Sequence, residues 1–182
     1  PPGRAGKNTL LLKIPYGRKT NLENLYLLGS FGVHVQGTRA YITKRKLPVY
    51  FGDITGQGYP FYGGSVDYDM KFLLEREAET AIKVPHFCAP VLEVWLDGKS
   101  KGLIAFSPHT LAVGRCGAGV HRLRIRAYGN RFNTFGTLHN CNAEYKWYGP
   151  DSYRTVDGEW SEAWQLRPFG ILSRVEIWTK EA

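Results

Sequence analysis

Methionine, cysteine and long apolar runs are scarce in this sequence, and each scarcity excludes a class of protein. One methionine and three cysteines occur among 182 residues. Cys88, Cys116 and Cys141 lie far apart and form no Cys-x-x-Cys pattern, so we expect three free thiols, no metal site and no disulfide framework. No apolar run approaches the roughly 20 residues of a bilayer-spanning helix, and no charged start with an apolar core indicates a signal peptide. We therefore expect no membrane partner.

Helical periodicity is almost absent as well, and turn residues and aromatic rings take its place. The chain has 21 glycines, 11 tyrosines, 9 phenylalanines and 5 tryptophans, a composition typical of sandwiches and barrels. A length of 182 residues fits one domain with a sizeable core. We predict an all-β fold, a jelly-roll β-sandwich that spans residues 1–182 as a single domain. Because the chain starts at Pro1 without an initiator Met, we expect it to be a piece of a longer protein.

Basic residues exceed acidic residues, and the net charge is +8 at pH 7. A basic chain suits nucleic acid, but no Gly-rich phosphate loop or helix-turn-helix pattern accompanies the charge. Arg122, Arg124 and Arg126 alternate with Leu123 and Ile125, so the arginines are expected to share the outer face of one strand. We interpret this stripe as a solubilising face or one that meets a neighbouring domain, with a grip on an acidic polymer as the alternative. We expect no nucleic-acid partner and no cofactor.

Alternating or continuous apolar residues predict strands along most of the chain. Besides the strand that follows residue 65, strands are expected at residues 9–14, 25–28, 31–36, 80–84, 91–96, 103–106 and 171–178, the last returning to the sheet near the first. Asp97-Gly98 is the strongest hairpin signal. The side chains expected to face the core are Val66, Tyr68, Met70, Phe72, Leu92, Val94, Leu123 and Ile125.

Residues 130–169 lack strand alternation but are rich in rings and amides. Loops of this length are usually functional or disordered, and the many aromatic residues argue against disorder. Sugar rings stack on aromatic side chains, while amide, guanidinium and imidazole groups bond sugar hydroxyls. If the chain binds a ligand directly, we expect a neutral glycan. The expected contacts are Arg131, Asn133, His139, Asn140, Trp147, Tyr148, Tyr153, Trp160 and Trp164, with Tyr62 from the glycine-rich loop at residues 57–65.

Two motifs stand out in the middle of the chain. The first runs Gly-Tyr-Pro-Phe-Tyr-Gly-Gly-Ser-Val-Asp-Tyr from Gly58 to Tyr68, and the second runs Leu-Glu-Val-Trp-Leu-Asp-Gly-Lys from Leu92 to Lys99. Pro108 and an apolar strand at residues 123–127 follow. Together, over residues 52–140, they resemble the sugar-binding-type, galactose-binding-like jelly roll of bacterial β-galactosidase-like glycoside hydrolases. The resemblance implies an accessory domain of a multidomain glycosidase whose catalytic residues lie on another domain.

The resemblance favours a non-catalytic module of a glycoside hydrolase, which either binds a glycan or packs on the adjacent catalytic domain. The alternative is a stand-alone glycosidase that uses two carboxylates of the long segment as acid and as nucleophile or base. The spacing of these carboxylates in the sequence does not report their separation in space, on which this chemistry depends. The candidates are Glu144, Asp151, Asp157, Glu159 and Glu162.

Overall fold

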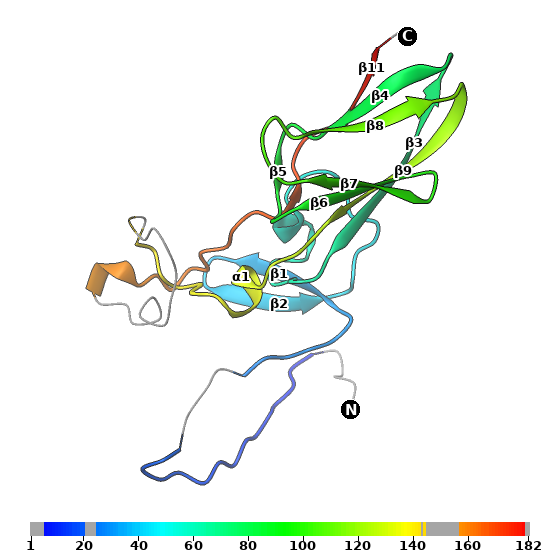
Figure 1. Cartoon of the computed structure of the whole chain (residues 1–182). Coiled ribbons are helices and arrows are strands. Elements are labelled where there is room, and N and C mark those ends of the chain that lie inside the picture. The colour runs from blue at the N-terminus through cyan, green and yellow to red at the C-terminus, as the bar shows by residue number, and fades with distance from the viewer. Residues whose placement is uncertain (1–5, 21–24, 143, 145–156, 181–182) are drawn as a thin grey trace.

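The structure, a computed structural model, describes residues 6–20, 25–142, 144 and 157–180 (Figure 1). Antiparallel strands provide nearly all of its regular structure. One sheet has four strands in the order β3-β9-β6-β7, and another has three strands in the order β11-β4-β8. The apolar faces of these sheets meet in a common core. The expected all-β sandwich is therefore confirmed.

The four-stranded sheet consists of β3 (Val66–Leu74), β6 (Leu92–Leu96), β7 (Lys99–Ile104) and β9 (Gly119–Ala127). The three-stranded sheet consists of β4 (Ala78–Lys83), β8 (Thr110–Cys116) and β11 (Glu176–Lys180). Two short antiparallel pairs complete the strands of the described residues: β1 (Gly32–Gln36) with β2 (Arg39–Thr43), and β5 (Phe87–Cys88) with β10 (Gly170–Ile171).

In the described residues, helices are limited to single turns. They are η1 (Ile54–Gln57), α1 (Phe132–Phe135) and η3 (Asp157–Glu159). No helix in the described part of the chain is long and apolar enough to cross a membrane. Two of these turns, α1 and η3, lie within residues 130–169, the segment that lacks strand alternation in the sequence.

The core lies where the alternation predicts it. Val66, Tyr68, Leu92, Val94, Leu123 and Ile125 are buried, while Met70 and Phe72 are half-buried and pack against the core. The Tyr68 hydroxyl accepts a hydrogen bond from the Ile171 amide at 3.3 Å, and burial raises its pKa above the ordinary value. A buried phenol therefore links β3 to β10 across the core.

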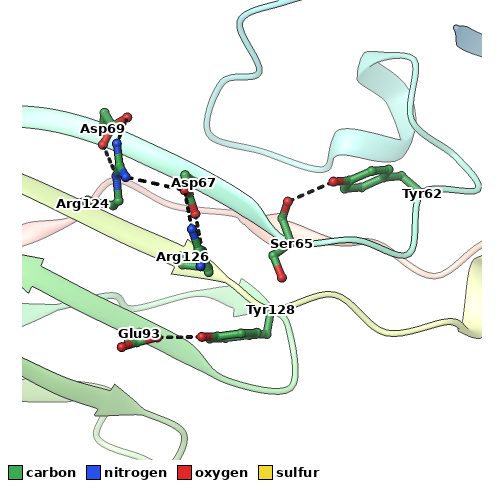
Figure 2. A network of polar contacts seen from close by, with 8 residues as sticks. All are labelled: Tyr62, Ser65, Asp67, Asp69, Glu93, Arg124, Arg126 and Tyr128. Atoms are coloured by element: carbon green, nitrogen blue, oxygen red, sulfur yellow. Dashed lines mark hydrogen bonds and ion pairs between the residues drawn. The ribbon is translucent and has the colours of Figure 1, made fainter. Parts of the chain in front are cut away.

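The outer face of the four-stranded sheet carries the arginine stripe. In the β3–β9 register Asp69 lies opposite Arg124, and Asp67 lies opposite Arg126. Each pair forms two hydrogen bonds between guanidinium and carboxylate (Figure 2). Asp67 and Asp69 thus neutralise two of the three arginines of the stripe.

The Asp97-Gly98 hairpin joins β6 to β7 as expected. Both turn residues have positive φ, 50° at Asp97 and 79° at Gly98, the values that a type I′ turn requires. The Asp97 carboxylate accepts hydrogen bonds from the Arg122 amide at 2.8 Å and from Nδ1 of His121 at 2.7 Å. The return strand begins at Lys99 and ends at Ile104, earlier than the predicted 103–106, because the two-residue turn lets pairing resume at once.

Two predicted strands near the N-terminus are wrong. Residues 9–14 and 25–28 form no strand, and their leucines are exposed, by 78% at Leu10 and 70% at Leu25. An apolar run becomes a strand only where another backbone pairs with it, and within the described residues neither run belongs to a ladder. The expected position of the last strand is also wrong, because β11 pairs with β4.

The glycine-rich loop at residues 57–65 approaches the end of β9 very closely. A Cβ atom at Gly129 would lie 2.1 Å from the carbonyl oxygen of Gly64, and one at Gly63 would lie 2.6 Å from Oγ1 of Thr134. The Thr134 hydroxyl donates to the Phe61 carbonyl at 2.9 Å. These contacts hold the start of the long segment against the sandwich, because Gly63 and Gly129 have no side chains and let the two backbones approach closely.

Candidate functional site

A groove of about 840 Å³ lies beside the sandwich, and we call it the aromatic groove. One wall comes from residues 25–28 and the β1–β2 pair, and the other from residues 134–140 with Trp160 and Trp164. Figure 1 shows β1 and β2 running beside α1. The amide of Val33 in β1 donates to the Gly58 carbonyl at 2.9 Å, so the glycine-rich loop fixes both walls.

An irregular backbone ladder builds the second wall. The amides of Cys141, Ser161 and Gln165 donate to the carbonyls of Glu159, His139 and Leu138 at 2.8, 2.8 and 2.7 Å respectively. Asn140 and Trp160 form an antiparallel bridge within it. The ladder thus ties residues 138–141 to residues 159–165 and brings two distant stretches of the long segment together.

Aromatic rings gather where this ladder closes. The His139 ring stacks on Trp160 at 4.8 Å between centroids and contacts Trp164 at 4.6 Å. Phe61 packs edge-on against Trp164 at 4.9 Å. Nδ1 of His139 lies 2.9 Å from the Ser161 carbonyl; because a carbonyl only accepts, Nδ1 is the donor. Trp160 remains 48% exposed, so one large ring faces solvent.

Two buried polar atoms of the groove lack partners. Oγ1 of Thr137 and Nε1 of Trp164 form no hydrogen bond with any described residue, although Thr137 is only 6% exposed. A buried unsatisfied group costs about 1–3 kcal/mol. Nε1 of an indole only donates, whereas a hydroxyl both donates and accepts. Because each atom has almost no exposed surface, a ligand hydroxyl would reach it only after neighbouring side chains move aside.

The aromatic groove carries no formal charge on its described lining. The residues that line it are aliphatic, aromatic, hydroxyl or amide residues, together with His139 and Gly136, and none is Asp, Glu, Lys or Arg. An ionised ligand would lose hydration there without gaining an opposite charge. The lining therefore suits a neutral molecule.

The structure brings together part of the predicted ligand set. His139, Asn140, Trp160 and Trp164 all line the aromatic groove. Trp147, Tyr148 and Tyr153 lie outside the described residues, and their contribution stays a prediction.

The remaining predicted contacts have partners elsewhere. The Tyr62 hydroxyl donates to the Ser65 carbonyl at 3.0 Å. The Arg131 guanidinium lies over the Phe135 ring, 5.9 Å from its centroid. The Asn133 amide is buried and donates to the Arg167 carbonyl at 2.7 Å while accepting from the Arg167 amide at 3.0 Å. None of the three lines the groove, and Asn133 instead clamps the returning chain.

The sequence predicts neither the wall formed by residues 25–28 nor the buried hydroxyl of Thr137. Leu25, Tyr26, Leu27 and Leu28 line the groove, yet the sequence places them in a strand because a continuous apolar run fits both a buried strand and an exposed wall. Nothing in the sequence distinguishes Thr137 from any other threonine. Only the structure shows that its hydroxyl is buried without a partner among the described residues.

The carboxylates of the long segment show no paired arrangement in the described residues. Glu159 accepts a hydrogen bond from the Asn142 side chain at 2.7 Å, a contact within the ladder region. Glu144 and Glu162 are exposed. Asp151 and the side chain of Asp157 lie outside the described part of the structure. Within that part, no three His, Cys, Asp or Glu side chains are placed to hold a metal ion.

Comparison with known proteins places the fold but assigns no family. Neither a family model nor any curated protein matches this sequence. Among solved structures, the chain resembles part of a rhamnosidase from Novosphingobium sp. PP1Y, with a TM-score of 0.51 and 17% identity. That match covers 90% of this chain and 16% of the rhamnosidase.

A GH2 β-galacturonidase from Eisenbergiella tayi matches less closely. Its glycerol-bound structure gives a TM-score of 0.41 and 19% identity, and the match covers 84% of this chain and 23% of that one. Its galacturonate-bound structure gives a TM-score of 0.36 and 18% identity, with coverages of 55% and 21%. The likeness to the rhamnosidase concerns the fold alone, and this chain spans only 16% of the length of that protein.

Proposed function

We propose that this chain is a non-catalytic, galactose-binding-like module of a glycoside hydrolase and that its aromatic groove binds a neutral glycan. One observation carries the proposal: a groove with no Asp, Glu, Lys or Arg on its described lining combines the exposed Trp160 ring with two buried polar atoms that lack partners among the described residues. Such a groove offers stacking surface and directional hydrogen bonds at the same place, which a saccharide needs and an aliphatic ligand does not.

Each part of the groove has a role in this proposal. A pyranose ring would place its C–H face on Trp160, whose ring His139 supports from behind. Nε1 of Trp164 would donate to a sugar oxygen, and Oγ1 of Thr137 would exchange a hydrogen bond with a sugar hydroxyl. Binding would therefore remove the cost of two unsatisfied groups as well as adding contacts.

The fold supports the accessory role by analogy. The sandwich resembles a stretch that accounts for 16% of a rhamnosidase, so a comparable sandwich exists within a larger glycosidase. Fold alone does not fix function, and the glycan specificity rests on the groove. Packing against an adjacent domain is the rival use of the same exposed rings.

The test is calorimetric titration of the chain with a panel of neutral plant and host oligosaccharides. Trp160→Ala should weaken the binding of any ligand found by about 2 kcal/mol, the loss typical of a central aromatic contact. Trp178→Ala is the matched control, because Trp178 is 50% exposed and lies in β11, outside the groove lining. Equal losses in both variants would contradict the assigned site.

A second measurement separates the glycan proposal from its two rivals. If no oligosaccharide binds and Trp160→Ala lowers the melting temperature sharply, the rings serve packing and not recognition. If the chain hydrolyses aryl glycosides, and replacing Glu159 with Gln abolishes that activity, the chain is itself a glycosidase. We expect ligand binding, an unchanged melting temperature and no hydrolysis.

A further inference from the structure

A second hollow, of about 920 Å³, lies on the outer face of the four-stranded sheet, and we call it the charged hollow. Its floor is regular sheet from β3, β6 and β9, close to the Asp97-Gly98 turn. It is independent of the aromatic groove, with which it shares no lining residue. Around Trp95 it is lined by Asp69, Lys71, Asp97, Arg122, Arg124 and Arg126.

The acidic side chains of this face already have partners. Asp69 binds Arg124 at 2.7 and 3.0 Å, and Asp67 binds Arg126 at 2.6 and 2.8 Å (Figure 2). The hydrogen bond from Arg126 holds the pKa of Asp67 below its ordinary value, so Asp67 stays ionised. Asp97 is bound by His121 and by the Arg122 amide. No acidic group of the hollow is left to neutralise a further cation.

Two cations remain. Lys71 and Arg122 lie directly opposite each other in the β3–β9 register, and both are exposed. Neither side chain forms an ion pair with a residue in the described part of the chain. Like charges at directly opposed positions destabilise an antiparallel pair. An anion between them would convert this repulsion into attraction.

The surroundings of this pair indicate the kind of anion. Trp95 lies opposite Arg124 in the β6–β9 register, which makes it the diagonal neighbour of Arg122, within reach of one bound molecule. Arg126 lies over the Trp95 ring, 5.2 Å from its centroid. A guanidinium binds a carboxylate through two parallel hydrogen bonds, and an indole contacts sugar C–H groups. Protein interfaces, in contrast, have centres depleted of charge.

We propose that the charged hollow binds a carboxylate-bearing sugar, a uronic acid residue, with its carboxylate between Lys71 and Arg122 and its ring beside Trp95. The two ion-paired arginines, Arg124 and Arg126, are held by Asp69 and Asp67 and form a rigid floor. They position the site, whereas Lys71 and Arg122 discriminate acidic from neutral sugars.

The experiment uses the whole chain and a linear glucuronic acid oligomer as the probe. A neutral glucose oligomer of the same linkage and length is the control ligand, and a hexaglutamate peptide tests charge without a sugar ring. The probe should bind measurably by calorimetry at low ionic strength, and the two controls should bind at least about tenfold more weakly, the effect of one charged hydrogen bond.

The matched variants carry the same change of charge. Lys71→Gln with Arg122→Gln removes the proposed pair, and Lys44→Gln with Arg45→Gln removes two exposed cations near β2, outside the hollow. The first variant should raise the dissociation constant of the probe about tenfold or more, and the second should leave it nearly unchanged. Because all four side chains are exposed, neither variant should melt below the wild type, and removal of the opposed pair should raise the melting temperature slightly.

Four results would overturn the proposal. They are failure of the probe to bind, equal binding of the neutral oligomer, equal binding of hexaglutamate, and equal weakening by the two double variants. The first two exclude uronate recognition, the third leaves an acidic peptide as the ligand, and the fourth leaves only the long-range attraction of a basic chain.

Discussion

The aromatic groove and the charged hollow have similar volumes but opposite chemistry and construction. The groove has no charged side chain on its described lining, whereas charged side chains make up most of the polar lining of the hollow. Irregular chain builds one wall of the groove through the ladder between residues 138–141 and 159–165. Regular strands build the floor of the hollow.

This difference in construction determines which polar atoms are satisfied. In the hollow, the strict register of β3 and β9 places Asp67 and Asp69 opposite arginines, so their carboxylates are bound. In the groove, no such repeat exists, and Thr137 and Trp164 keep buried polar atoms without partners among the described residues. The sheet register pairs both carboxylates but sets Lys71 opposite Arg122, so the sheet leaves cations for a ligand, whereas the irregular wall leaves a buried hydroxyl and a buried indole N–H.

The largest expected effect tests whether the hollow lies above a true core. Leu123→Ala should lower the free energy of unfolding by about 2–5 kcal/mol, since Leu123 is buried beneath the hollow. Arg124→Ala should leave it nearly unchanged, because its ion pair with Asp69 is exposed and screened. Urea denaturation measures both. Equal losses would mean that the faces of β9 are assigned wrongly.

The same contrast explains how far the sequence alone could lead. Period-two alternation predicts the core face of β3 and β9 and the position of Arg122, Arg124 and Arg126 on the outer face. It does not reveal that Asp67 and Asp69 neutralise two of these arginines, because cross-strand register depends on which strands become neighbours. The hairpin at Asp97-Gly98 was predictable because the two turn residues by themselves indicate a type I′ turn.

The groove was less predictable for a physical reason. The composition of residues 130–169 shows that aromatic residues are plentiful there, and His139, Asn140, Trp160 and Trp164 do come together. The ladder that assembles them consists of backbone hydrogen bonds between positions without a repeating side-chain pattern, such as Cys141 with Glu159. Composition can therefore indicate which residues are available, but only tertiary pairing decides which of them meet.

The next largest effect is expected from ionic strength, which should weaken ligand binding in the charged hollow but not in the aromatic groove. Raising sodium chloride from low concentration to about 0.5 M should weaken uronate binding several-fold, because salt screens the charges of Lys71 and Arg122. Neutral-glycan binding should change little, because the described lining of the groove is uncharged. Calorimetry on one preparation with both ligands provides the comparison. A common salt dependence would show that both ligands occupy one site.

Thr137→Val should have a smaller effect, and it should stabilise the fold instead of destabilising it. Removing an unsatisfied buried hydroxyl should raise the free energy of unfolding by about 1 kcal/mol while weakening glycan binding. Thr134→Val is the control, because the Thr134 hydroxyl donates to the Phe61 carbonyl, and its loss should destabilise by about 1 kcal/mol. Thermal and urea unfolding measure both variants. Destabilisation by Thr137→Val would indicate that its hydroxyl has a partner after all.

The smallest expected effect concerns the rim of the charged hollow, where His121 binds Asp97. The hydrogen bond from Asp97 raises the pKa of His121 above its ordinary value, and the bond from the Arg122 amide, followed by that from His121, lowers the pKa of Asp97. A raised histidine pKa gives stability that is complete below about pH 6.5 and is lost as the pH rises through the folded pKa. Asp97 stays ionised throughout this pH range, since its contribution is lost only as the pH falls through its lowered pKa.

The His121–Asp97 pair should therefore make the chain slightly more stable near pH 5.5 than near pH 8.5, by less than about 1 kcal/mol because Asp97 is exposed. In Asp97→Asn, the side-chain oxygen still accepts the hydrogen bond from the Arg122 amide, and asparagine tolerates positive φ, but the negative charge is gone. Thermal melts of this variant should therefore show no difference in stability between pH 5.5 and pH 8.5 from the pair. Parallel pH profiles for the two proteins would show that the pair does not stabilise the turn electrostatically.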